Sequence, residues 1–154
     1  MSAGSAGLLR FVRVLEKLLG GGQLVRFRAP GWSMHPTIRN GEIITVAPLG
    51  RSPVRIGDVV LYRRREAAIA HRVVRVRSCA GQPSTLVLRG DAADSCDPPV
   101  RIGQVLGRVV AVERRGRARR LDVLSPCWST AVGRALRRAR VVRMKVGVLI
   151  GSRA

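Results

Sequence analysis

The segment Ala68-Ile69-Ala70-His71-Arg72-Val73-Val74-Arg75-Val76-Arg77 decides the fold class of this chain. It is one of several short runs in which β-branched residues recur with a period of two, and that pattern is typical of strands. Similar runs occupy positions 24–28, 42–46, 59–62, 85–88 and 104–112. Because no crossover helix separates these runs, they predict a mainly antiparallel β domain.

Turn-forming residues separate the runs. Gly, Pro, Asn and Asp gather at positions 40–41, 48–53, 79–84 and 91–99, where the chain is expected to reverse. Asp58, which opens a run, is interpreted as a turn residue. With 154 residues, 46% of them hydrophobic, the chain is long enough for one domain with a real core. We divide it into a tail and helix at 1–22, a β domain at 23–124 and a basic helical tail at 125–154.

The N-terminal region predicts a short amphipathic helix at 8–19, preceded by a flexible tail at 1–7 and ended by Gly20-Gly21-Gly22. Four of the twelve helical residues are charged, so the segment is far from the about 20 apolar residues that cross a bilayer. It does not resemble a cleaved signal peptide either. Two interpretations stay open: the helix packs on the domain, or it lies on a membrane surface.

The C-terminal region predicts a basic amphipathic helix at 129–146. Eleven basic residues and one acid, Asp122, lie between positions 114 and 145. A solvated helix face is the commoner meaning of such a run, and contact with lipid or nucleic acid is the alternative. Sequence-specific nucleic-acid binding is not expected, because no helix-turn-helix, zinc-finger or aromatic stacking pattern accompanies the charges.

The whole chain is strongly basic, with 29 Lys and Arg against 9 Asp and Glu and a formal net charge of +20. Genome composition can account for part of this arginine bias, but the charge attracts anionic partners whatever its origin. The three cysteines, Cys79, Cys96 and Cys127, show neither Cys-x-x-Cys spacing nor a histidine cluster. We therefore expect no metal, no cofactor and no disulfide framework, and a reducing compartment.

The candidate nucleophile is Ser33, in Gly31-Trp32-Ser33-Met34-His35-Pro36-Thr37. Pro36 removes a backbone donor and restricts His35, so this stretch should be turned or extended. Gly31 allows the backbone to approach a substrate carbonyl closely. A serine between glycine and proline is usually only a turn residue. The rest of the chain changes that view, because it adds His71 and then an aspartate-rich loop at 91–97.

Four blocks in this order resemble the signal peptidase superfamily. They comprise 33–37 with 41–44, then 56–60, then 71–74, then 90–91 with Asp97. Most bacterial members have a lysine base where this chain has His71, so the resemblance is closest to the endoplasmic-reticulum and archaeal type. It implies a Ser-His-Asp peptidase on a coiled antiparallel β-sheet or barrel of the signal peptidase and LexA-like type, with short terminal helices.

The chemistry assigns a role to each candidate residue. His71 is the expected base, because imidazole accepts a proton near neutral pH and can activate a serine hydroxyl. His35, two residues from Ser33, is the weaker candidate because Pro36 holds it. From the resemblance, Asp97 orients His71, and Asp91 supports the loop through Arg72 or Arg89. Asp94 is interpreted as a turn residue.

The oxyanion of the reaction is expected to meet the backbone N–H of Ser33, with a second donor near Gly31. Met34 is expected to pack beneath the site rather than to touch the substrate.

The sequence thus predicts a serine endopeptidase that cuts a precursor or leader peptide docked along a strand edge. We expect it in the cytoplasm or peripherally on an anionic membrane. Two alternatives remain. One is a self-cleaving regulator of the LexA type, but such regulators pair serine with lysine and carry an N-terminal DNA-binding domain, for which the 32 residues before Ser33 leave little room. The other is a catalytically silent basic binding module.

Overall fold

The computed structural model describes residues 3–78, 80–121 and 142–144. This part of the chain contains one α-helix, one short 3-10 helix and nine strands. The elements are α1 (Ala3–Gly20), β1 (Val25–Arg28), β2 (Ile43–Ala47), β3 (Val59–Arg64), β4 (Ala67–Arg77), β5 (Thr85–Arg89), β6 (Val100–Arg101), η1 (Ile102–Gln104), β7 (Val105–Arg114), β8 (Arg117–Arg120) and β9 (Val142–Met144).

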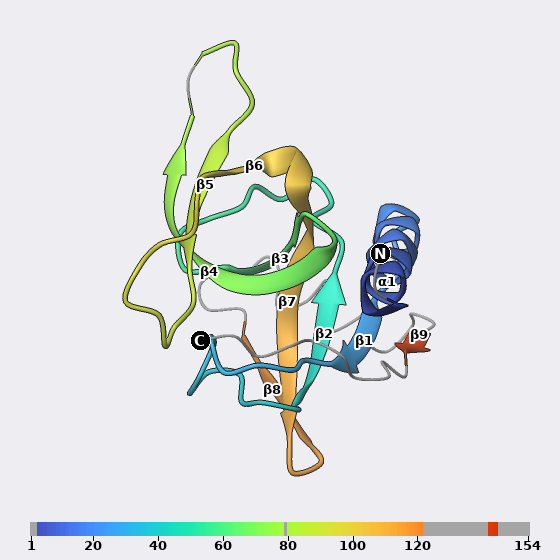
Figure 1. Cartoon of the computed structure of the whole chain (residues 1–154). Helices are drawn as coiled ribbons and strands as arrows, with labels where there is room; N and C mark the ends of the chain where they lie inside the picture. The colour runs from blue at the N-terminus through green and yellow to red at the C-terminus, as the bar shows by residue number, and fades with distance from the viewer. Residues whose placement is uncertain (1–2, 79, 122–141, 145–154) are drawn as a thin grey trace.

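All nine strands belong to one sheet, in the order β6-β5-β4-β3-β7-β2-β1-β9, with β8 paired to β7 beside this path. Every pairing is antiparallel except that of β1 with β9. Register shifts interrupt β2–β7, β3–β7 and β4–β5, and such irregularities increase twist. The sheet is accordingly strongly coiled, and β4 runs across the direction of β7 (Figure 1).

The predicted mainly β fold is confirmed, and the sheet is open. Its path begins at β6 and ends at β9, which do not pair with each other, so of the two expected forms, a coiled sheet or a barrel, the barrel is wrong.

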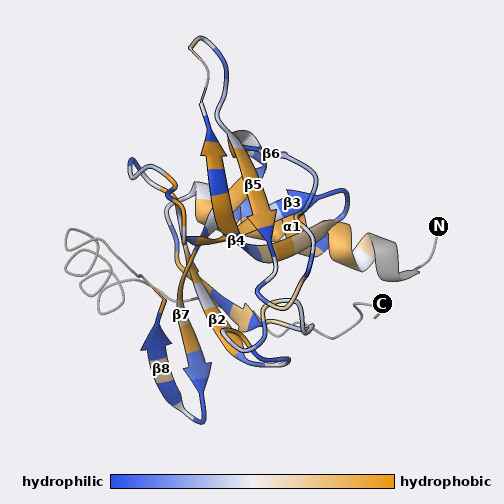
Figure 2. Ribbon diagram, turned by 90° about the vertical axis from the view of Figure 1, so that its left-hand side faces the viewer, coloured by the Kyte–Doolittle hydropathy of each residue, from blue (hydrophilic) through white to orange (hydrophobic). Residues whose placement is uncertain are grey.

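Two core clusters lie on opposite faces of β3, and this explains its unbroken apolar run. Val59 and Leu61 belong to the first cluster, whereas Val60 and Tyr62 belong to the second. The first cluster also contains residues from α1, β1, β2 and β7, and the second contains residues from β4, β5 and β6. In Figure 2, β5 is accordingly largely hydrophobic, whereas the exposed β8 is largely hydrophilic.

Helix α1 packs on the sheet through the first cluster. Val12 and Leu15 are fully buried and Leu19 is 3% exposed, while the opposite side carries Arg10 and Arg13. The packed interpretation of this helix is therefore correct, because this apolar side is already covered by the domain. No helix in the described residues is long and apolar enough to cross a membrane.

The ends of α1 differ from the prediction in one respect. The helix begins at Ala3 rather than at position 8, so the flexible tail expected at 1–7 is wrong from Ala3 onward. Alanine is the best helix former, and extending a packed helix costs much less than starting one. The C-terminal end is as predicted: Gly22 adopts φ +80°, and the N–H groups of Gly21 and Gly22 donate to Lys17 and Leu19.

All six predicted strands are present, close to the expected positions. The strands that the pattern missed are β6, β8 and β9. β6 has only two residues, and β8 is Arg-Ala-Arg-Arg with every residue exposed, so neither carries an alternating apolar signal.

The predicted basic helix at 129–146 falls mostly outside the described residues. Within it, however, Val142–Met144 form strand β9, parallel to β1, so the helix is wrong there. Pairing with the free edge of β1 supplies backbone hydrogen bonds that a helical wheel does not anticipate.

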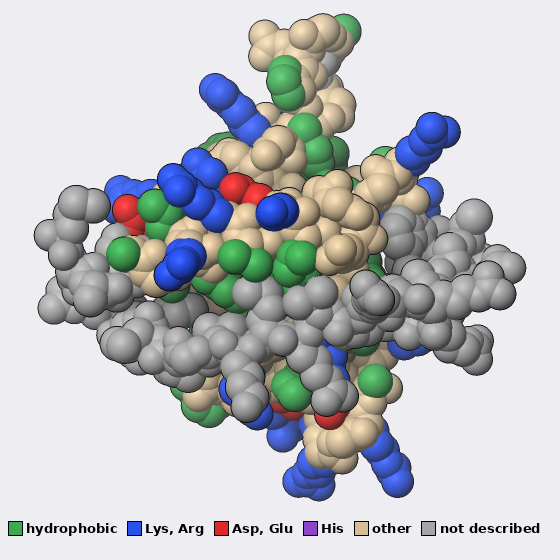
Figure 3. Space-filling view, turned by 90° about the vertical axis from the view of Figure 1, so that its right-hand side faces the viewer, with side chains coloured by type: hydrophobic (Ala, Val, Ile, Leu, Met, Phe, Trp, Pro, Cys, Tyr) green, Lys and Arg blue, Asp and Glu red, His purple; other side chains and the backbone are tan. Residues whose placement is uncertain are grey.

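On the face drawn in Figure 3, Lys and Arg side chains project at several separate places. In the described part of the chain one arginine is buried: Arg108, 6% exposed, pairs with Asp58 at 3.0 Å. Asp58 also accepts a hydrogen bond from the backbone N–H of Arg55, as expected of a turn residue.

Candidate active site

Ser33 lies in the connection between β1 and β2. This connection is a series of turns, which agrees with the predicted turned or extended stretch. The N–H of Gly41 donates to Ala29 at the base of this loop, and the N–H of Gly31 donates to Asn40 Oδ1 at 2.9 Å. Gly31 has φ +105° and open space where a Cβ would stand, so a glycine is favoured here by backbone conformation. Ser33 itself is exposed to solvent.

His71 comes from the middle of β4 and faces the second cluster. Its register partner on β3 is Val60, a member of that cluster, and partners in an antiparallel pair share a face. The residue is 8% exposed. Its Nε2 lies 3.0 Å from Ser33 Oγ. The structure therefore places a shielded imidazole directly beside the hydroxyl of an exposed serine.

Asp97 approaches the other nitrogen of the same ring. Its Oδ2 lies 2.5 Å from His71 Nδ1, and its side chain is 13% exposed. The loop that carries it is tied to β5, because the N–H of Asp97 donates to Leu88 at 2.8 Å. Ser33, His71 and Asp97, predicted from three separate segments, are thus brought into one hydrogen-bonded series.

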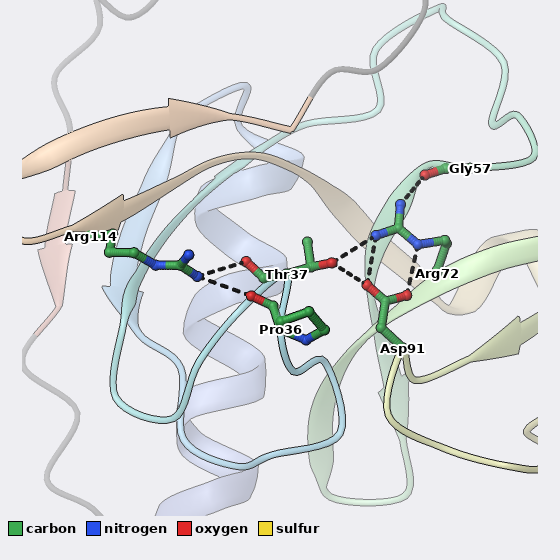
Figure 4. Close-up of polar contacts among 6 residues, drawn as sticks. All are labelled: Pro36, Thr37, Gly57, Arg72, Asp91 and Arg114. Carbon is green, nitrogen blue, oxygen red and sulfur yellow. Dashed lines mark hydrogen bonds and ion pairs between the residues drawn. The ribbon is translucent and has the colours of Figure 1, made fainter.

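Asp91 lies on the opposite side of β4 and supports the Ser33 loop. Arg72 follows His71 and points to the other face, where its Nε and Nη2 each lie 2.7 Å from an Asp91 oxygen. Thr37 donates its hydroxyl to Asp91 at 2.5 Å, and Arg72 Nη1 donates to Gly57 O (Figure 4). Of the two partners proposed for Asp91, Arg72 is therefore the one in contact.

The pKa of Asp91 reflects these contacts. Burial alone would raise it, but the hydrogen bonds from Arg72 and Thr37, together with nearby positive charge, outweigh burial and lower the pKa of the carboxyl group. Successive side chains of β4 point to opposite faces, so the two aspartates serve different faces: Asp97 contacts His71 and Asp91 contacts Arg72. Asp94, between them, is exposed.

Gly90 lies where a side chain would collide with Ser33. A Cβ on Gly90 would stand 2.5 Å from Ser33 O and 3.1 Å from both Ser33 Cβ and His71 Nε2. The N–H of Ala92 donates to Ser33 O at 2.9 Å. Only a residue without a side chain lets the loop pack this tightly against the Ser33–His71 pair.

A second arginine, which the sequence analysis did not single out, holds the other side of the Ser33 loop. Arg114, at the end of β7, donates through Nη2 to Pro36 O at 3.0 Å and to Thr37 O at 3.5 Å (Figure 4). Glu42 accepts from Arg114 Nε and Nη2, and the hydrogen bond from Arg114 lowers the pKa of Glu42. The loop is therefore fixed from two sides at Thr37.

Two residues of β3, also missed, lie near Asp97. Arg64 Nη1 is 3.6 Å from Asp97 Oδ1, and the ring centroids of Tyr62 and His71 are 6.3 Å apart. Tyr62 is fully buried, and its hydroxyl lies near Asp97 and Arg64 without making a well-formed hydrogen bond. Burial first, and then the charge of Asp97, raise the pKa of Tyr62, so its hydroxyl remains protonated.

The other three candidates, Met34, Gly31 and His35, lie near Ser33 in the sequence. Met34 is 4% exposed and packs in the first cluster beneath the loop, as expected. The N–H of Gly31 donates to Asn40 Oδ1, so it is not free to donate to an oxyanion. The N–H of Ser33 therefore remains the predicted oxyanion donor. His35 is exposed, with its ring 6.2 Å from that of Trp32, and takes no part in the series.

Within residues 3–78, 80–121 and 142–144, no three His, Cys, Asp or Glu side chains gather as metal ligands would. Cys96 is an exposed free thiol, while Cys79 and Cys127 lie outside the described residues.

Comparison with known proteins adds nothing to this picture: no protein-family model matches the chain, and no curated protein matches it.

Proposed function

We propose that the chain is a serine endopeptidase, with Ser33 as nucleophile, His71 as base and Asp97 as the group that orients the base. The observation that carries the proposal is the series of two contacts, 3.0 Å from Ser33 Oγ to His71 Nε2 and 2.5 Å from His71 Nδ1 to Asp97 Oδ2. A proton on Nδ1 donated to Asp97 leaves the Nε2 lone pair facing the serine hydroxyl, which is the tautomer that a base requires.

The reaction would proceed in two halves. His71 Nε2 takes the Ser33 proton as Oγ bonds to the substrate carbonyl carbon, and the carbonyl electron pair moves onto oxygen. The tetrahedral intermediate then collapses, the C–N bond breaks, and the leaving amine takes the proton from His71. Water repeats these steps on the Ser33 ester, which releases the carboxylate product and restores the serine hydroxyl.

Charge on the tetrahedral oxygen would be met by the backbone N–H of Ser33. Such a donor is useful only if its position is fixed before the substrate arrives. The contacts of Arg114 and Asp91 at Thr37, and of Ala92 at Ser33 O, restrain the loop on which this N–H lies.

The proposed substrate is an extended peptide that pairs with β4. β5 pairs with β4 only from Arg72 to Arg77, so within the described residues the stretch from Ala67 to His71 has a strand neighbour only on the β3 side. This open edge leads directly to His71. Backbone pairing there would deliver a scissile carbonyl to Ser33, and the resemblance to signal peptidases adds a preference for small residues before it.

A peptide library tests the proposal. The purified chain and its Ser33→Ala variant are incubated with mixed peptides, and both peptides and protein are followed by mass spectrometry. Peptide cleavage by the unmodified chain alone is expected. Loss of mass from the protein itself, dependent on Ser33, would replace the proposal with the self-cleaving alternative. Absence of both reactions would leave a binding module.

A further inference from the structure

The two oxygens of Asp97 have different partners. Oδ2 is bound to His71, whereas Oδ1 faces Arg64 Nη1 at 3.6 Å. Arg64 is the last residue of β3, where its register partner on β4 is Ala67. Its side chain is 49% exposed and that of Asp97 is 13% exposed, so the pair lies at the rim of the site.

Among the residues that the structure describes, Arg64 is the cation that pairs with this carboxylate. Tyr62, on the same face of β3, is buried against the His71 ring and remains neutral. Arg72, the neighbouring cation on β4, points to the opposite face and is bound in a bidentate pair to Asp91. Besides these groups, only Ser33 contacts His71 directly through a polar atom in the described residues.

We propose that Arg64 is a positioning residue of the base, which holds the outer oxygen of Asp97 and weakens the attraction of that carboxylate for a proton on His71. A carboxylate beside imidazole favours the imidazolium form, and that form cannot accept the serine proton. A cation beyond the carboxylate opposes the second positive charge while it leaves the orienting hydrogen bond in place.

If Arg64 were only structural, its replacement would change the free energy of unfolding and not the titration of His71. A half-exposed ion pair at 3.6 Å adds little to stability, because solvent screens it and the long side chain loses freedom. Its effect on the imidazole is less screened, because the buried Tyr62 ring excludes water from one side of His71. Unfolding and titration therefore separate the two roles.

The experiment is an NMR titration of the histidine ring protons in the full chain. The sequence contains two histidines, so exposed His35 serves as an internal reference for His71. The variants are Arg64→Gln, the conservative Arg64→Lys, and Arg65→Gln, which removes the same charge one residue further along. We expect the titration midpoint of His71 to move to higher pH in Arg64→Gln alone, with His35 unchanged and urea unfolding as in the parent chain.

An equal His71 midpoint in Arg64→Gln and Arg65→Gln would overturn the inference, as would failure of Arg64→Lys to restore the parent value. The inference rests on the proposed function for its catalytic meaning, but the titration needs no substrate. If His71 shifts and no peptide is cut, the proposed function alone fails. If peptides are cut and the acid limb of kcat/KM does not follow Arg64, this inference alone fails.

Discussion

Replacing Gly90 with alanine should separate Ser33 from His71 while the fold persists. The added methyl would stand 2.5 Å from Ser33 O, whereas ordinary contact begins at 3.4 Å, so one of the two segments must move by about 0.9 Å. The obstacle is a backbone carbonyl held by the Ala92 N–H, so no side-chain rotation can relieve it. The same methyl would lie 3.1 Å from His71 Nε2, the atom that must receive the proton.

The expected magnitude follows from this displacement. A shift of about 1 Å in reacting groups can cost about 100-fold in rate, so kcat/KM for a cleaved peptide should fall by about two orders of magnitude. Overpacking typically costs about 1–3 kcal/mol in the free energy of unfolding, partly offset by the reduced entropy of the unfolded chain. Gly90 has no positive φ, so backbone strain adds nothing.

Two glycines provide matched controls. Alanine at Gly103 meets no atom within 4 Å and should leave both stability and activity unchanged. Alanine at Gly107 would stand 2.5 Å from Ala47 O, so Gly107→Ala should lose similar stability but keep its activity under conditions where it is folded. Equal loss of activity per unit of stability in Gly90→Ala and Gly107→Ala would refute the steric argument.

Three further predictions concern the charged groups. Asp97→Asn should lower kcat far more than Asp94→Asn, because only Asp97 contacts His71; equal effects in steady-state assays would contradict this. Asp91→Asn should lower the free energy of unfolding at neutral pH, because the folded state lowers the pKa of Asp91 and so gains stability from its charged form. The difference in unfolding free energy between the parent chain and the variant should shrink as pH falls below the ordinary aspartate pKa of 3.8, where Asp91 becomes protonated. A difference in urea unfolding that does not change with pH would contradict this. With +20 net charge, the chain should co-sediment with anionic vesicles at low salt and be released by high salt, whereas equal binding to neutral vesicles would mean that charge is not the cause.

Six of the nine described strands, and the three central residues of the candidate site, could be predicted because their signals are local. A run such as that around His71 shows its period within a few residues, and the order of Ser33, His71 and Asp97 can be read without knowing the fold. The resemblance then separated Asp97 from Asp94, which composition alone does not. The structure adds that Asp91 and Asp97 serve opposite faces of β4.

The residues that were missed act over long sequence separations. Arg114 reaches Pro36 only because β7 and β2 pair antiparallel, and Arg64 reaches Asp97 only because β3 lies beside β4. In a chain with 29 basic residues, no composition signal distinguishes these two arginines from the others. Strand β8, built from exposed residues, was missed for a similar reason: its pairing with β7, rather than an apolar face, defines it.

The most direct test of the central claim is to look for an acyl group on Ser33 during turnover. A peptide that the chain cuts is mixed with excess protein, the reaction is quenched in acid after a short time, and the intact mass and the Ser33-containing fragment are measured. The account predicts a transient adduct on Ser33 whose mass equals that of the N-terminal product less one water, and none in Ser33→Ala or His71→Ala. Continued cleavage by either variant, or an adduct that forms equally without His71, would contradict it.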